Sequence, residues 1–175
     1  LGTFGNLGCF SFYPTKNLAA LGDGGAIVTD SKQLADICRQ IRDYGQSQKY
    51  IHTRYGLNSR LDEFQAAILS YKLTSLNLQN QKRTEIAGRY IKNLSSCKYI
   101  EIITSKITNK PNYHLFVIKT DRRDQLKKYL EENGIQTAIH YPLTIPDQPF
   151  FKTEHEQLSL PVARNFVNTC LSLPC

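Results

Sequence analysis

The chain has 175 residues, 41% hydrophobic and 10% aromatic, a composition that supports a hydrophobic core and excludes an intrinsically disordered protein. The net charge of +7 favours an anionic partner. The basic residues are dispersed and form no nucleic-acid-binding motif, so we expect a small phosphorylated ligand and no nucleic acid. No apolar stretch could cross a bilayer and no signal peptide is evident, so we expect a soluble, cytoplasmic protein without membrane contact.

The cysteines argue against a disulfide framework and against a metal site. There are five, an odd number, and no two are spaced as CxxC. We therefore expect reduced thiols and no bound metal. The chain opens on Leu-Gly-Thr without a methionine and stops at Leu-Pro-Cys, and from these ends we expect a piece of a longer polypeptide.

Short strands open the chain. Apolar and aromatic runs predict strands at 8–13 and 26–29, joined by a glycine-rich loop. Either Asp30 or Ser31 caps a helix whose apolar positions follow a helical period, and this helix ends before Gly45.

A long helix is the main feature of the next segment. Residues 45–58 are polar and read as an extended loop. Ser59 and Asp62 have the spacing of a capping box, which predicts that a helix starts there. The apolar stripe continues to about Leu94, with a kink expected near Gly88. We place a domain boundary near residue 95.

Beyond this boundary strands and helices alternate. Gly134 stands where a glycine would end the first of these helices. The pattern predicts strands at 99–103, 114–119 and 136–140, and helices at 122–132 and 161–170.

Lys16 is the first candidate for chemistry. It follows a buried strand and lies in a loop of small residues. A desolvated amine has a lowered pKa and can attack a carbonyl to form a Schiff base. The alternative is a solvated loop lysine, and spacing alone leaves both interpretations open.

Several segments together resemble the DegT/StrS-type nucleotide-sugar aminotransferases. They are CFSFYPTKNL at 9–18, LGDGGAIVT at 21–29, GLNSRLDEFQAAIL at 56–69, HYP at 140–142 and QP at 148–149. Their order and spacing also match that family. The resemblance implies a mixed α/β fold, in which 1–95 is the C-terminal part of a fold-type-I large domain that binds pyridoxal 5′-phosphate, with a long connecting helix. Residues 96–175 would then be an incomplete small α/β domain.

The resemblance also implies roles for single residues. Lys16 would bind pyridoxal phosphate covalently and then move a proton. Ser11 would donate a hydrogen bond to the cofactor phosphate, and Asn58 would reach the same phosphate from the neighbouring subunit of a homodimer. The sugar-nucleotide site would be formed by Tyr13, Lys49, His140 and Tyr141.

Each role has a structural alternative. Ser11 could be only a small residue on a buried strand, and Asn58 only part of a helix cap, although a helix N-terminus also suits a phosphate. Lys49 could be a solvated charge in a polar loop. His140 could be a structural residue at a domain edge.

The implied reaction transfers an amino group, with L-glutamate as the expected donor, to a nucleotide-linked keto sugar for surface polysaccharide or deoxyamino-sugar synthesis. Two alternatives are a non-catalytic remnant and a related sugar dehydrase. Dehydrases of this family carry histidine in place of the lysine, so Lys16 favours transamination. The partner of the pyridine nitrogen would lie in sequence not present here, so we expect the 175-residue piece alone to be inactive.

Overall fold

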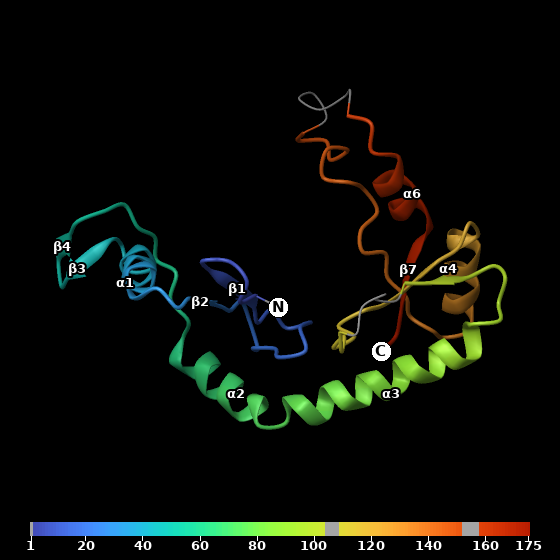
Figure 1. Cartoon of the computed structure of the whole chain (residues 1–175), viewed down its shortest axis with the longest axis horizontal. Coiled ribbons are helices and arrows are strands. Elements are labelled where there is room, and N and C mark those ends of the chain that lie inside the picture. The colour runs from blue at the N-terminus through green and yellow to red at the C-terminus, as the bar shows by residue number, and fades with distance from the viewer. Residues whose placement is uncertain (1, 104–108, 152–157) are drawn as a thin grey trace. The chain divides into compact units, whose positions relative to one another are not determined.

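The computed structural model describes residues 2–103, 109–151 and 158–175. Its contacts divide the chain into two compact units, Leu1–Gln79 and Asn80–Cys175 (Figure 1). The division falls inside α3 (Leu76–Leu94), whereas the sequence pattern places a boundary at the end of that helix. The reason is packing, because α3 contributes Ala87 to the core of the second unit. How the whole protein divides into domains stays a prediction.

The first unit begins with an antiparallel strand pair. β1 (Gly8–Ser11) and β2 (Gly25–Val28) lie where the sequence predicts strands. Next comes α1 (Lys32–Ile41), and its N-cap is Ser31, whose hydroxyl accepts a hydrogen bond from the backbone N–H of Leu34 at 3.3 Å. Of the two predicted caps the structure selects Ser31.

The segment predicted as an extended loop at 45–58 contains a small ribbon. β3 (Gln46–Gln48) pairs antiparallel with β4 (Ile51–His52). The sequence did not indicate these strands because the segment is polar and lacks the alternation of a half-buried strand. Tyr44 and Tyr50 adopt positive φ angles of 58° and 68°, at the entry to the ribbon and in its turn.

The predicted long helix is two helices. α2 (Glu63–Leu73) and α3 are separated at Thr74 and Ser75, whose hydroxyls donate to backbone carbonyls of the preceding turn at 2.8 and 3.1 Å. Such hydroxyls compete with the backbone hydrogen bonds of a helix, and the break lies here and not at Gly88. The predicted capping box is wrong, because Asp62 precedes α2 but its side chain makes no capping hydrogen bond.

A three-stranded antiparallel sheet in the order β5-β6-β7 forms the second unit's centre. Its strands are β5 (Glu101–Ile102), β6 (Phe116–Lys119) and β7 (Cys170–Leu173). β7 begins where the last helix was predicted to end. The strand predicted at 136–140 is wrong, because only Ala138 forms an isolated bridge, to Ser172.

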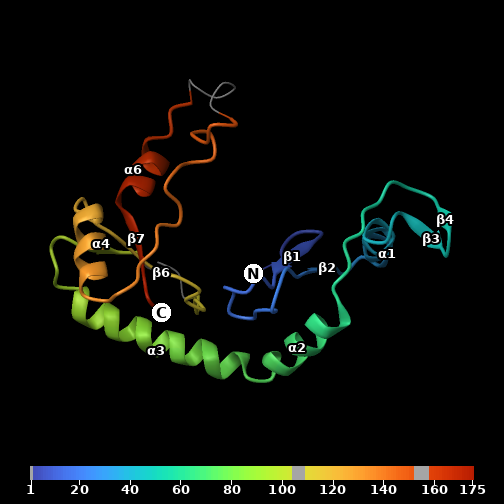
Figure 2. The same ribbon diagram turned by 180° about the vertical axis from the view of Figure 1, so that it is seen from behind.

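Two helices accompany this sheet, α4 (Arg123–Glu132) and α6 (Pro161–Thr169). α4 lies beside β7 in both views (Figures 1 and 2). Buried side chains of β6 and β7 form the core, and Tyr90 of α3 stacks on Phe116 with ring centroids 4.9 Å apart. Burial raises the pKa of the Tyr90 phenol.

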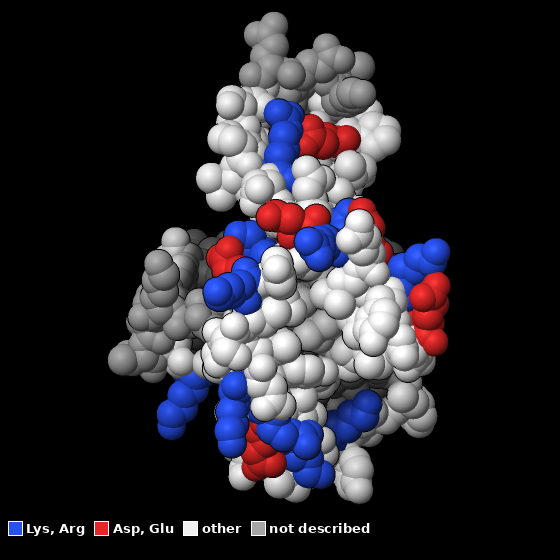
Figure 3. All heavy atoms as spheres, turned by 90° about the vertical axis from the view of Figure 1, so that its right-hand side faces the viewer, with Lys and Arg blue, Asp and Glu red and all other residues white. Residues whose placement is uncertain are grey.

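Charged side chains of both signs lie on the second unit's surface. On the face drawn in Figure 3, Lys and Arg side chains lie beside Asp and Glu. In α4, for example, Lys127 and Lys128 approach Glu131 and Glu132 to 3.9 Å. Within the described ranges no helix is long and apolar enough to span a bilayer.

Gly134 ends α4 as the sequence predicts. Its φ is +74°, and its N–H donates to the carbonyl of Glu131 at 3.0 Å. The next N–H, of Ile135, reaches the carbonyl of Leu130 at 2.8 Å. These two bonds form a Schellman motif, which requires a left-handed residue.

Two glycines of the second unit should respond oppositely to alanine. A Cβ would meet nothing within 4 Å at either Gly88 or Gly134, so only backbone conformation differs. Gly134→Ala should destabilise by about 1–2 kcal/mol because of its positive φ, and Gly88→Ala, inside α3, should stabilise by about 0.5–1 kcal/mol. Denaturant unfolding of the full-length protein tests this pair. Shifts of the same sign would contradict the backbone explanation.

Candidate functional site

A tight turn brings three of the predicted site residues together. The backbone N–H of Lys16 donates to the carbonyl of Tyr13 at 2.8 Å, and Pro14 occupies the second position of this turn, which its fixed φ favours. The N–H of Tyr13 in turn donates to Oγ of Ser11 at 3.3 Å. Ser11, Tyr13 and Lys16 therefore form one hydrogen-bonded segment, in which Lys16 is half-buried.

Backbone bonds of Phe12 close the loop that carries Lys16. Its N–H donates to the carbonyl of Gly24, and its carbonyl accepts from the N–H of Ala20, both at 2.8 Å. Ala19 and Ala20 are buried at the base of this loop. The small residues noted in the sequence thus allow close packing next to the lysine.

Asn58 lies outside any helix, which corrects the interpretation as a helix cap. It forms an isolated bridge with Asp43, five residues before α2 begins. Its Oδ1 accepts a hydrogen bond from Nε of Arg60 at 3.2 Å. The amide oxygen thus has a partner, and the amide nitrogen of this exposed residue is a hydrogen-bond donor.

Lys49 is exposed in the turn between β3 and β4. Its Nζ lies 5.2 Å from the ring centroid of Tyr50. No carboxylate within the described ranges forms an ion pair with it. Such a cation is available to an anionic ligand.

His140 and Tyr141 belong to the second unit. Nδ1 of His140 lies 2.9 Å from Oγ of the buried Ser172, and the His140 and Tyr141 rings meet edge to face with centroids 5.4 Å apart. The segment after them is fixed to α6, because Arg164 donates two hydrogen bonds to Asp147, at 2.8 and 3.1 Å. These bonds raise the pKa of the Arg164 guanidinium.

The sequence did not reveal the residues that hold these site residues in place. They are Gln65 and Lys72 on α2, which bond to the loop carrying Lys16, and Ser172, which bonds to His140. The spacing of Gln65 and Lys72 by seven residues puts both on one helix face. The seven-residue spacing was visible in the sequence, but nothing in the sequence indicated that both side chains bond to the loop that carries Lys16.

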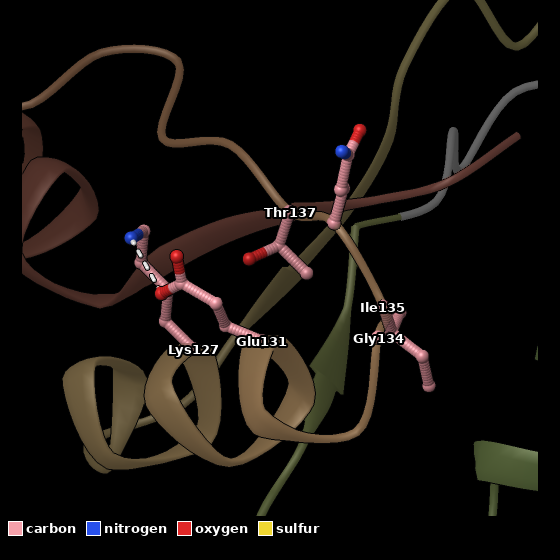
Figure 4. A pocket seen from close by; sticks show the side chains of 6 residues that line it. Lys127, Glu131, Gly134, Ile135 and Thr137 are labelled. Carbon is pink, nitrogen blue, oxygen red and sulfur yellow. Dashed lines mark ion pairs between the residues drawn. The ribbon is translucent and has the colours of Figure 1, made fainter.

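A separate pocket of about 390 Å³ adjoins the end of α4 (Figure 4). An ion pair of Lys127 with Glu131 lies at its edge. None of the predicted site residues lines it. In the part of the chain that the structure describes, no cluster of three or more His, Cys, Asp or Glu side chains could hold a metal ion.

Known proteins similar to this chain include sugar aminotransferases. The dTDP-3-amino-3,4,6-trideoxy-alpha-D-glucose transaminase of Streptomyces venezuelae is 41% identical over 99% of this chain and 46% of its own length. The crystal structure of S. venezuelae DesV in complex with a ketimine intermediate superposes with a TM-score of 0.95, at 41% identity, and covers 99% of this chain and 47% of that one.

NtdA from Bacillus subtilis, solved with bound cofactor PMP, has a TM-score of 0.87 and 33% identity over 99% of this chain and 42% of its own. The chain thus spans about half the length of the relatives it matches. These likenesses support the α/β fold of the pyridoxal-phosphate transferases. The model of the DegT/DnrJ/EryC1/StrS aminotransferase family matches residues 1–175, and the chain belongs to this family.

Proposed function

We propose that this chain is part of a pyridoxal-phosphate-dependent aminotransferase that acts on a nucleotide-linked keto sugar. The observation that carries the proposal is the hydrogen-bonded turn that joins Ser11 and Tyr13 to a half-buried Lys16. The transaminase relatives support the substrate class. The proposal also includes L-glutamate as the amino donor and a cytoplasmic location. The product would be used in the synthesis of surface polysaccharides or deoxyamino sugars.

The residues around Lys16 fit pyridoxal phosphate. This cofactor presents an aldehyde, which needs an amine, and a phosphate, which needs hydrogen-bond donors. Within the described ranges Lys16 forms no ion pair with a carboxylate. The oxygen of Ser11 accepts from Tyr13, so its own hydrogen remains available for a phosphate oxygen.

The chain's residues then have separate tasks. When bound, the cofactor supplies an electron sink. Nζ of Lys16 would hold it covalently and, once released, would accept and return a proton at the amino-bearing carbon. The Ser11 hydroxyl holds the phosphate. Lys49 and His140, with the rings of Tyr13 and Tyr141, bind the sugar nucleotide.

The role proposed for Asn58 involves a second subunit. Its side-chain nitrogen is a donor suited to a phosphate, and its Oδ1 is held by Arg60. No hydrogen bond of the described residues joins Asn58 to Ser11. We propose that Asn58 serves the phosphate of a second subunit, so that a homodimer has two shared sites.

The cofactor should be attached at Lys16. Borohydride treatment of the full-length protein should abolish its visible absorbance band, and peptide mapping should find the reduced cofactor on Lys16, because Lys16 shares a hydrogen-bonded segment with Ser11, whose hydroxyl can donate to the cofactor phosphate. Lys16→Ala should lose the band. Lys32→Ala, at an exposed helix lysine paired with Asp36, is the control. Recovery of the cofactor on any other lysine would contradict the assignment.

Shared sites predict complementation between two inactive variants. Lys16→Ala and Asn58→Ala dimers, assayed at limiting cofactor, should each be inactive. In a mixed dimer one site receives both defects and the other neither, so mixing should restore activity. The rate of transamination after subunit exchange measures this. No recovery, although mixed dimers form, would mean that each site is built from one chain.

Lys49 should contribute to binding of the nucleotide pyrophosphate. A charge-assisted hydrogen bond contributes about 1.5–3 kcal/mol, so Lys49→Ala should weaken sugar-nucleotide binding roughly ten- to a hundredfold. The glutamate half-reaction should be spared, since glutamate carries no pyrophosphate, and Lys49→Arg should retain most of the affinity. Equal damage to both half-reactions would instead assign Lys49 to the fold or the cofactor.

A further inference from the structure

Two side chains of α2 are bonded to the loop that carries Lys16. Oε1 of Gln65 accepts from the backbone N–H of Leu21 at 2.8 Å. Nζ of Lys72 donates to the carbonyl of Ala19 at 2.7 Å. These are long-range bonds, since 44 and 53 residues separate the partners in sequence. Because both side chains lie on one helix face, α2 holds the loop at two points.

The loop lies against α2 with little space between them. A Cβ at Gly22 would come within 3.3 Å of Nε2 of Gln65 on α2, and one at Gly24 within 3.1 Å of Cδ1 of Leu61, in the segment just before α2. Ala19 is only 8% exposed. A carbonyl in such a place needs a partner, because a buried acceptor without a hydrogen bond costs about 1–3 kcal/mol. The ammonium group of Lys72 provides that partner.

We propose that Gln65 and Lys72 are positioning residues that hold the Lys16 loop in its cofactor-binding conformation. The inference rests on the proposed function of Lys16. Leu21 and Ala19 lie on the C-terminal side of Lys16, and the turn from Tyr13 fixes its N-terminal side. Because the backbone on both sides of Lys16 is held by hydrogen bonds, the loop loses little conformational entropy when the cofactor binds. Such preorganisation favours cofactor binding.

The full-length enzyme tests this with matched variants. Gln65→Leu and Lys72→Met keep the approximate side-chain size and remove the hydrogen-bonding atoms, whereas Lys72→Arg keeps charge and donors. Lys32→Met, on exposed α1, is the control. One measurement is deuterium exchange of the peptide 17–24 in cofactor-free protein. The second is pyridoxal phosphate affinity, from the absorbance band.

We expect Gln65→Leu and Lys72→Met to exchange about ten- to a hundredfold faster in this peptide and to bind pyridoxal phosphate at least tenfold more weakly. Lys72→Arg and the Lys32 control should stay within about threefold of the parent protein. Melting temperatures separate a local effect from a loss of folding, and the rescue by arginine shows that the donor matters.

Several results would overturn the proposal. One is parent-like exchange in both variants, and another is faster exchange without weaker cofactor binding. A Lys72→Arg variant as impaired as Lys72→Met would also overturn it. Failure of the proposed function is a different result, because borohydride would then label another lysine. Deuterium exchange of the peptide 17–24 in the cofactor-free protein reports the contacts of α2 with the loop, whether or not Lys16 binds the cofactor.

Discussion

Both backbone groups of Phe12 are hydrogen-bonded, and this double pairing fixes the loop on which the candidate site depends. Its N–H bonds to Gly24 and its carbonyl to Ala20. Phe12 therefore continues the pairing of β1 with β2 by one residue and also closes the loop beyond it. Lys16 lies within that closed loop, so its position follows from the backbone and not from its own flexible side chain.

The lysines of the first unit divide into two groups by their partners. Lys32 pairs with Asp36 and Lys72 with a backbone carbonyl, so both contribute to structure. Lys16 and Lys49, by contrast, have no carboxylate partner within the described ranges, and they are the two lysines to which we assign a ligand. Lys16 lies in the closed loop, and Lys49 lies in the turn between β3 and β4.

In the second unit Ser172 has a comparable role. Its backbone exchanges two hydrogen bonds with Ala138, at 2.8 and 3.2 Å, and its hydroxyl contacts His140. It also pairs with Val117 in the sheet. A single buried residue thus links the sheet to the segment that carries His140, so this segment is held at the sheet although no strand forms at 136–140.

The sequence by itself determined the features that depend on neighbouring residues. These include the strands around Lys16, a helix cap at Asp30 or Ser31, the Gly134 helix end and the resemblance to the family. The ribbon at Gln46–His52 was missed because its sequence is polar and lacks the alternation of a strand. Tertiary structure alone decided the contacts of α2 with the Lys16 loop. The reason is physical: caps, turns and helical periodicity are set within a few residues, whereas these contacts pair polar groups across 44 and 53 residues, and no local pattern specifies the partner.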